Sequence, residues 1–362
     1  MSGNATGEYD PFARGPHPVG VRTVELLDER RARRFPCEVW YPATASERGR
    51  DVAQDGGDAY PRPDGVQVRR QAAVRDARGE PGSYPFVLFA HGTVPWRRRS
   101  ATYLCTHLAS RGYVVAALDH SETLVPELAR RPDETETERS ARVDALIAAR
   151  VPDVTFALDA LLGGAAPLAG VVLDHDRVAI AGYSFGGWTA LAATATDRRI
   201  GATVALAPAG SARPKPGIIP ATLDLPWDRP VPVLLLAAQN DVAIPLDRVT
   251  ELFERCAPPK RLFVLRRADH VHFLDAVEEE HEALRASASP PPLDAMAREM
   301  QPIAELTSGD IAHAFARGLT TAHYDAELRD VPGARELLER QRAAALLARG
   351  IPAFEVAAAA RP

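Results

Sequence analysis

The sequence has few of the features that mark secreted, zinc-binding or membrane-spanning proteins. Its 362 residues include only three cysteines, which lie far apart at Cys37, Cys105 and Cys256. A small, odd number of cysteines without a Cys-x-x-Cys pair argues against a disulfide framework and against a zinc site. No apolar run approaches the ~20 residues that a membrane span needs, and residues 1–20 lack the basic and apolar regions of a signal peptide. These absences predict a cytoplasmic protein.

An excess of charge of one sign is also missing. The formal net charge is -5, and the basic residues form no continuous stripe. This composition gives no reason to expect nucleic acid or another polyanion as a partner. With 46% hydrophobic and 25% charged residues, the chain has the composition of an ordinary globular protein with a large core. Its length fits one α/β domain with insertions.

One short stretch stands out, Gly182-Tyr183-Ser184-Phe185-Gly186, which has the pattern Gly-x-Ser-x-Gly. The residues before it form a compact apolar run typical of a buried strand, and the residues after it favour a helix. Strand, tight turn and helix are the context in which this pattern forms a nucleophile elbow. Any side chain at the two glycines would collide with the neighbouring strand or helix. We therefore take Ser184 as the candidate nucleophile; the alternative is an inert serine in a glycine-rich turn.

The rest of the chain alternates between expected strands and helices. The apolar runs that predict buried strands are residues 85–90, 113–118, 177–182, 201–206, 231–238 and 261–265, of which the last is the final clear strand. Strand, helix and strand in succession imply parallel pairs with right-handed crossovers. Residues 19–27 and 35–42 predict an antiparallel hairpin at the N-terminal edge, with prolines marking that edge. The expected fold class is α/β, with a doubly wound, mostly parallel sheet.

We expect one core at residues 19–286, with four segments that depart from its regular pattern. They are an irregular N-terminal arm (1–18), a long surface loop (44–83), a lid-like insertion (121–150) and a C-terminal helical extension that packs on the core (287–362). The loop is predicted from its high content of Gly, Pro, Asp and Arg. One or two helices should run from 139 to 162, interrupted near Pro152.

A serine hydroxyl becomes a good nucleophile only with a base within reach and a group that orients the base. In an open α/β sheet such groups gather at the carboxyl ends of the strands, here in the chain order serine, acid, histidine. Asp241 directly follows the strand 231–238 and is the best candidate for the acid, although it could also form a turn or cap the next helix. Three other carboxylates are less well placed: Asp224 and Asp228 lie in the proline-rich loop before that strand, and Asp247 lies at the start of the next helix.

Two histidines follow the strand 261–265, and the residues alone leave the choice of base open. His270 comes sooner after the strand, whereas His272 could begin the next helix. Either could act as the base or as a hydrogen-bonded loop histidine. His91 and His120 close buried strands and are expected to bond nearby backbone.

Acyl transfer also needs fixed donors for the oxygen that becomes negative in the transition state. We expect the backbone N–H of Phe185, at the start of its helix, to be one donor. The other is the N–H of Thr93, in the loop after the strand 85–90.

Aromatic and basic residues near these positions are candidate substrate contacts. Trp96 lies close after Thr93, and Tyr183 precedes the nucleophile, although aromatic residues there can simply pack. Residues Arg97, Arg98 and Arg99 could attract an acidic acyl chain. Such a run of charge is more often a solvated helix start.

Together these residues resemble the α/β-hydrolase superfamily. Within it they are similar to the platelet-activating factor acetylhydrolase and dienelactone-hydrolase-like esterases, near the cutinase-type polyester hydrolases. The matching stretches are Val39–Ala43, Phe89–Gly92, Leu108–Ala117, Ala181–Gly187 and Ala268–Asp275. The resemblance implies an α/β-hydrolase fold with Ser184 as nucleophile and His270, in preference to His272, as base. It also implies Thr93 and Phe185 as the oxyanion donors.

Two departures from this branch affect the assignment. True dienelactone hydrolases have a cysteine where this chain has Ser184. The mammalian acetylhydrolases place the acid after the strand that follows the elbow, but here that strand runs into Ala207-Pro208-Ala209. We therefore expect the acid one strand later, at Asp241, as in cutinase-type enzymes. The insertion at 121–150 and the tail beyond Ser287 have no clear template, so the family does not supply a substrate.

The sequence thus predicts a serine hydrolase that cleaves a small or medium acyl ester or a lactone through an acyl-enzyme. The mechanism needs no metal and no organic cofactor. The expected partner is a small-molecule ester, with no nucleic acid and no membrane span; the sequence predicts no oligomeric state. The same triad could instead transfer the acyl group, close a lactone or cleave a β-diketone. A catalytically inactive binding protein with this fold is the alternative from another class.

Overall fold

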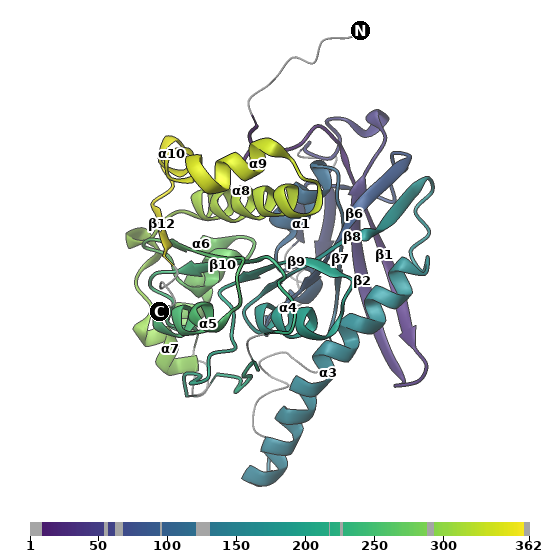
Figure 1. The fold of residues 1–362 in the computed structure, drawn as a ribbon. Helices are drawn as coiled ribbons and strands as arrows, with labels where there is room; N and C mark the ends of the chain where they lie inside the picture. The colour runs from purple at the N-terminus through teal and green to yellow at the C-terminus, as the bar shows by residue number, and fades with distance from the viewer. Residues whose placement is uncertain are drawn as a thin grey trace.

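The computed structural model describes residues 9–53, 57–61, 68–94, 96–120, 131–216, 218–224, 227–287 and 293–357. A 10-stranded sheet in the order β12-β11-β10-β9-β8-β6-β7-β2-β1-β5 runs through the centre (Figure 1). Its strands are β1 (Val19–Asp28), β2 (Arg33–Pro42), β5 (Val74–Arg75), β6 (Gly82–Ala90), β7 (Val114–Leu118), β8 (Val171–Tyr183), β9 (Ile200–Leu206), β10 (Val233–Ala238), β11 (Lys260–Leu265) and β12 (Ala353–Val356). A separate hairpin contains β3 (Asp58–Pro61) and β4 (Val68–Gln71).

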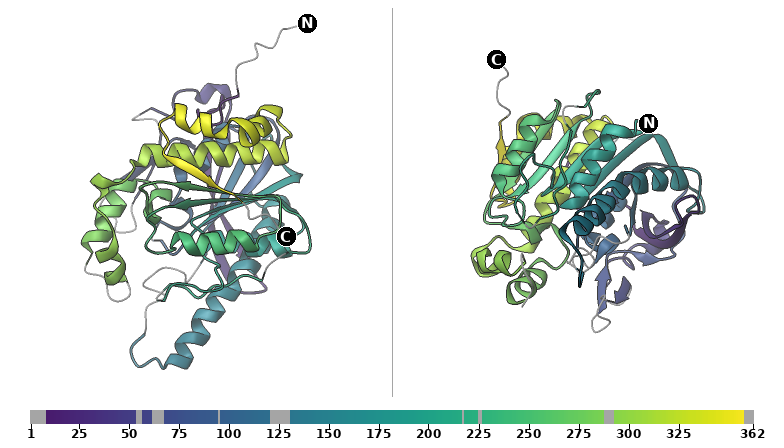
Figure 2. Two further views of the ribbon diagram at one scale, coloured as in Figure 1. Left: turned by 60° about the vertical axis from the view of Figure 1, so that its left-hand side comes forward. Right: turned by 90° about the horizontal axis from the view of Figure 1, so that it is seen from below.

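Helices cover both faces of this sheet (Figures 1 and 2). On one face lie α1 (Thr102–Ser110) and α8 (Gly309–Leu328), and on the other lie α3 (Glu136–Leu162), α4 (Phe185–Thr196) and α5 (Leu246–Arg255). The remaining helices are α6 (Val277–Ala286), α7 (Leu293–Glu299), α9 (Pro332–Glu336), the π-helical η5 (Leu337–Gln341) and α10 (Arg342–Ala348). Short 3-10 turns are η1 (Ala45–Glu47), η2 (Arg97–Arg99), η3 (His270–Phe273) and η4 (Ile303–Glu305). No helix among the described residues combines the length and the apolar character that crossing a bilayer requires.

The pairing of the strands confirms the predicted fold class. From β7 to β11 neighbouring strands run parallel, and β1, β2 and β7 pair antiparallel at the N-terminal side. The predicted edge position of β2 is wrong, because β2 pairs with β7 as well as with β1. Its prolines, Pro36 and Pro42, lie outside the segment Cys37–Trp40 that pairs with β7. They therefore interrupt no hydrogen bond of that second ladder.

Residues 44–83 are more ordered than the predicted surface loop. Their described part contains the β3–β4 hairpin and β5, which pairs with β1. Asp58 and Gln71 are buried there, and Gln71 accepts a hydrogen bond from Trp40 Nε1 (2.6 Å). A polar composition indicated exposure, but these polar side chains are buried because they satisfy one another.

Helix α3 runs without a break through Pro152, where we predicted an interruption. It begins with a capping box between Thr135 and Glu138, which satisfies two free backbone donors of its first turn. Its second half buries a set of apolar residues against the sheet, namely Val154, Ala157, Leu158 and Leu161. The first half projects from the body of the molecule (Figure 1). Of the expected lid-like insertion, residues 121–130 lie outside the described residues.

The N-terminal arm meets the C-terminal helices on the α1–α8 side of the sheet. The described part of the expected arm, residues 9–18, forms neither helix nor strand, and Phe12 is buried next to Gly318 of α8. Residues of α8, α9 and α10 belong to the main hydrophobic core, so that core does not end at the predicted boundary, residue 286. The expectation that 261–265 is the final strand is also wrong, since β12 pairs antiparallel with β11.

Candidate active site

Ser184 lies in a sharp turn between β8 and α4 with a left-handed backbone (φ 57°, ψ -119°). Such a conformation is strained for a residue with a side chain and persists only where its surroundings enforce it. A Cβ at Gly182 would lie 2.0 Å from the carbonyl oxygen of Gly186, and one at Gly186 would lie 1.9 Å from that of Ala90. Both glycines are therefore required by close backbone contacts, as the sequence pattern predicted.

A chain of hydrogen bonds connects Ser184, His270 and Asp241. His270 Nε2 lies 2.9 Å from Ser184 Oγ, and His270 Nδ1 lies 2.7 Å from Asp241 Oδ2. The other carboxylate oxygen, Asp241 Oδ1, accepts the backbone N–H groups of Ala243 (2.8 Å) and Ile244 (2.7 Å). Asp241 is buried, while the His270 side chain is 16% exposed. The three groups follow β8, β10 and β11, and the sheet brings them to one edge.

The rival candidates lie elsewhere. His272 is fully buried, with Nδ1 accepting the N–H of Asp269 (3.0 Å) and Nε2 donating to the carbonyl of Thr307 (2.9 Å). Its ring therefore holds the loop and does not face Ser184. The other carboxylates considered for the acid, Asp224, Asp228 and Asp247, are exposed.

Tyr183 lies beneath the candidate histidine. Its hydroxyl donates to the carbonyl oxygen of His270 (3.0 Å), and its ring centroid is 5.0 Å from the imidazole. The side chain is only 1% exposed, and burial raises the pKa of Tyr183 well above its usual value. We expected Tyr183 to contact the substrate, but its buried, protonated side chain instead supports the loop that carries His270.

The loop after β6 lies directly against the nucleophile. A Cβ at Gly92 would be 3.0 Å from Ser184 Cβ and 3.1 Å from the carbonyl oxygen of Tyr183. Thr93 is the next residue, and Phe185 is the first residue of α4, so its N–H has no partner within the helix. The two expected oxyanion donors thus belong to segments that both adjoin Ser184.

Two histidines hold this loop, largely through the backbone contacts that we predicted. His91 Nδ1 donates to the carbonyl of Gly92 (2.6 Å), and His91 Nε2 accepts the N–H of His120 (3.0 Å). Burial, with Arg150 and His120 nearby, lowers the pKa of His91 well below its usual value. His120 Nδ1 also lies 3.2 Å from Asp153 Oδ2. His91 therefore stays neutral and connects the ends of β6 and β7.

Trp96, the other expected substrate contact, is 7% exposed. Its Nε1 donates to Glu280 Oε1 (3.0 Å), and the guanidinium carbon of Arg69 lies 3.9 Å from the centre of its ring. Arg69 also pairs with Glu280 (2.5 Å). These contacts connect the loop after β6 to β4 and α6.

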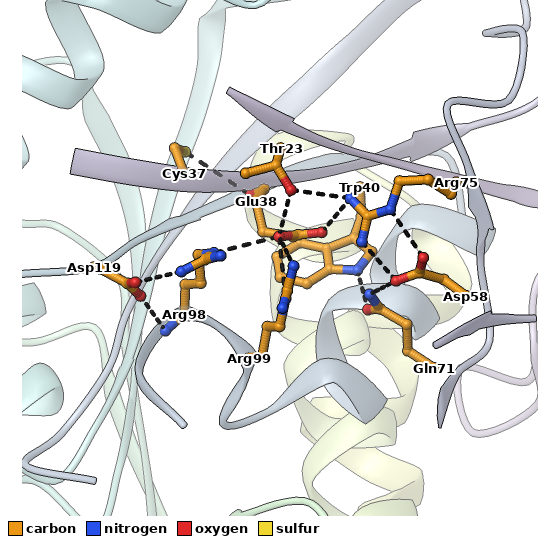
Figure 3. Close-up of polar contacts among 10 residues, drawn as sticks. All are labelled: Thr23, Cys37, Glu38, Trp40, Asp58, Gln71, Arg75, Arg98, Arg99 and Asp119. Carbon is orange, nitrogen blue, oxygen red and sulfur yellow. Dashed lines mark hydrogen bonds and ion pairs between the residues drawn. The ribbon is translucent and has the colours of Figure 1, made fainter. Parts of the chain in front are cut away.

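Two arginines of the basic run after Trp96, Arg98 and Arg99, are directed into the protein (Figure 3). Arg98 and Arg99 both contact the fully buried Glu38 of β2, at 3.3 Å and 3.0 Å, and Arg75 contacts its other oxygen at 2.6 Å. Arg98 also donates its backbone N–H to Asp119 Oδ1 (2.9 Å). Arg98 and Arg99 are therefore neither a solvated helix start nor free to bind an acidic acyl chain, because the buried carboxylate of Glu38 already pairs with them.

Sequence reasoning missed two residues that support the loop, Glu38 and Arg150. Glu38 was visible as a single charge in an otherwise apolar strand, and a charge in that setting requires a buried partner. Arg150 gave no such signal, because arginine is common on helices.

In the described ranges no group of three or more His, Cys, Asp or Glu side chains could hold a metal ion. The arrangement around Ser184 is suited to nucleophilic and acid–base chemistry.

Comparison with known proteins agrees with this geometry. A family model described as platelet-activating factor acetylhydrolase, isoform II, matches residues 66–140, which include the loop after β6. The chain has no match among the curated proteins. Among solved structures, the ferulic acid esterase from Streptomyces cinnamoneus matches with a TM-score of 0.66 and 24% identity, over 94% of this chain and 96% of that chain. The structural match shows the α/β-hydrolase fold. The family match supports a carboxylic ester hydrolase similar to the platelet-activating factor acetylhydrolases, the branch that the sequence motifs indicated.

Proposed function

We propose that this protein hydrolyses a carboxylic ester through an acyl-enzyme formed on Ser184, with His270 as base and Asp241 as the orienting acid. The observation that carries the proposal is the hydrogen-bonded chain from Asp241 Oδ2 through both ring nitrogens of His270 to Ser184 Oγ, at 2.7 Å and 2.9 Å. These distances permit proton transfer without rearrangement of the side chains.

In the first step Ser184 Oγ attacks the ester carbonyl while His270 Nε2 takes the hydroxyl proton. The C–O bond to the alcohol then breaks, and His270 returns the proton to the leaving oxygen. In the second step a water molecule, deprotonated by His270, attacks the acyl-enzyme. The acyl C–O bond to Ser184 Oγ then breaks, the acid is released, and His270 returns the proton to Ser184 Oγ. Asp241 stays ionised throughout, keeps the proton of the neutral ring on Nδ1 and stabilises the imidazolium.

We propose the backbone N–H groups of Thr93 and Phe185 as donors to the oxyanion. Both adjoin Ser184, and donors of this kind are typically worth about 3 kcal/mol each in the reaction barrier. The Phe185 N–H has the further advantage of the positive end of the α4 dipole.

For the substrate we propose a small or medium acyl ester or a lactone. The exposed edge of Trp96 would form a rigid wall, because Glu280 and Arg69 hold its ring in place. The first half of α3, the described part of the lid-like insertion, would limit the size of the substrate.

We also propose a reducing, cytoplasmic setting. Cys37, Cys105 and Cys256 are buried free thiols. Burial raises the pKa of Cys256 to about 12, so this thiol is not activated.

The test is to compare Ser184→Ala with the wild-type protein on p-nitrophenyl esters graded in acyl length and on a fluorophosphonate probe. We expect Ser184→Ala to lose both hydrolysis and labelling. Ser46→Ala, at an exposed position of η1, is the matched control and should retain both. Undiminished hydrolysis by Ser184→Ala would contradict the proposal.

A further inference from the structure

A fully buried arginine lies behind the candidate active site. Arg150 of α3 donates from Nε to Thr189 Oγ1 (3.0 Å) and from Nη2 to the carbonyl oxygen of His91. Its guanidinium carbon also lies 4.7 Å from the centre of the Phe185 ring. One side chain therefore contacts β6, α4 and the residue that follows the nucleophile.

These contacts join the two segments that carry the proposed oxyanion donors. The His91 carbonyl lies two residues before Thr93, and the hydrogen bond from Arg150 fixes the direction in which the chain leaves β6. On the other side, Thr189 Oγ1 donates to the carbonyl oxygen of Phe185 (2.9 Å), so Arg150 and Thr189 together hold the first turn of α4. A single planar group thus contacts both segments that carry the proposed donors.

The positive charge of Arg150 is poorly compensated. Burial lowers its pKa to about 9, which still leaves it charged near neutral pH. Among the described residues Arg150 forms no ion pair, and Nη1 has no hydrogen-bond partner. The carboxylate one turn further along α3, Asp153, is already paired with Arg31 (2.7 Å) and Arg33 (3.0 Å).

Asp153 and the Phe185 ring offset only part of the cost of burying this charge, so its retention calls for a role outside stability. We infer that Arg150 is a positioning residue for the oxyanion hole, holding the loop after β6 and the start of α4 at a fixed separation and favouring negative charge in the transition state. The inference rests on the proposed ester hydrolysis, because only that reaction creates the oxyanion. A merely structural arginine would affect folding but would not discriminate between the ester and its tetrahedral intermediate.

The experiment compares Arg150→Met, which removes charge and hydrogen bonds, with Arg150→Lys, which keeps the charge. The readouts are kcat and KM for p-nitrophenyl butyrate and the inhibition constant of an alkyl boronic acid, which forms a tetrahedral adduct with serine. We expect Arg150→Met to lower kcat on the order of 10²-fold with little change in KM, and to weaken the boronic acid by a similar factor. Arg150→Lys should recover part of both losses.

Arg198→Met is the matched control, since Arg198 is an exposed arginine that pairs with Asp228 at the surface; its kcat should equal that of the wild-type protein. If Arg150→Met folds and keeps its kcat, or loses kcat while binding the boronic acid normally, the inference is overturned. If Arg150→Met does not fold, Thr189→Val removes the acceptor of Arg150 Nε, and an unchanged kcat in that variant would overturn it too. Failure of the wild-type protein to hydrolyse any ester would instead overturn the proposed function.

Discussion

The side chain of Asp241 combines two roles that the sequence left as alternatives. One oxygen accepts two backbone N–H groups and so forms the turn after β10, while the other meets His270. Because both oxygens are engaged, the carboxylate has a single orientation. The turn-forming role and the proposed catalytic role therefore support each other.

Because the two carboxylate oxygens of Asp241 have different partners, the effect of Asp241→Asn can be predicted. The amide oxygen should remain with the backbone N–H groups of Ala243 and Ile244, which leaves the NH₂ group facing His270 Nδ1. The ring would then carry its proton on Nε2 and could not accept one from Ser184. We expect kcat to fall by about 10³- to 10⁴-fold with the fold intact, as measured by ester hydrolysis and circular dichroism.

Asp247→Asn, an exposed change on α5, is the control for this variant and should leave kcat unchanged. A kcat for Asp241→Asn close to the wild-type value would show that Asp241 does not set the tautomer of His270.

The residues missed from the sequence share a physical cause. Glu38 and Arg98 are 60 positions apart, and Arg150 and His91 are 59 apart, so no local pattern connects them. Ser184, Asp241 and His270 could be predicted because each follows a recognisable strand. Residues that support a loop through long-range contacts, such as Glu38 and Arg150, have no regular position relative to the strands, so the sequence pattern does not identify them.

Among the secondary structure elements, α3 shows where local rules fail. A proline inside a helix removes a backbone hydrogen bond and costs about 3 kcal/mol. The helix continues because its second half packs several apolar side chains against the sheet, and because Pro152 itself is exposed. Tertiary burial thus outweighs the local cost, which the sequence pattern could not reveal.

Pro152→Ala should therefore stabilise the protein. Alanine restores the missing N–H and removes the ring from the preceding turn, while the added freedom of the unfolded chain offsets part of the gain. We expect the free energy of unfolding in urea to rise by about 1–2 kcal/mol. Pro167→Ala, in the loop after α3, is the control and should give no gain. A Pro152→Ala variant less stable than the wild-type protein would indicate that the ring itself contributes to packing.

Across the fold, several histidines are held neutral in the interior. Burial lowers the pKa of His107 and of His323 to about 3, and lowers those of His91 and His120 well below their usual value. In the unfolded chain a histidine takes up a proton near pH 6.5. Below that pH the unfolded state binds more protons than the folded state, so stability falls as the pH falls; above it these groups contribute no slope.

We predict that the free energy of unfolding decreases steeply below about pH 6.5, by up to about 1.4 kcal/mol per pH unit for each such histidine. Urea unfolding at a series of pH values measures this slope. His107→Gln keeps an N–H donor for the carbonyl of Pro11 but cannot titrate, so its slope should be smaller. The exposed His175→Gln is the control. Equal slopes for His107→Gln and the wild-type protein would contradict this origin of the pH dependence.

The sheet was predictable where strands are long and apolar throughout. The run 261–265 matches β11 (Lys260–Leu265), and 201–206 matches β9 (Ile200–Leu206). By contrast β12 is short and half-buried, and it exists only because β11 offers a free edge. The hairpin β3–β4 was missed because its polar residues are buried through partners distant in sequence.

The position of α8 and β12 has a consequence for synthesis. The ribosome makes Ser184, Asp241 and His270 before it makes α8, whose Tyr324 hydroxyl bonds to the carbonyl of Ile180 on β8 (2.8 Å). A nascent chain that has emerged only to Ala286 therefore holds these three residues on a sheet whose α1–α8 face is covered by α1 but not by α8. Such a chain needs shielding from other hydrophobic surfaces until translation is nearly complete.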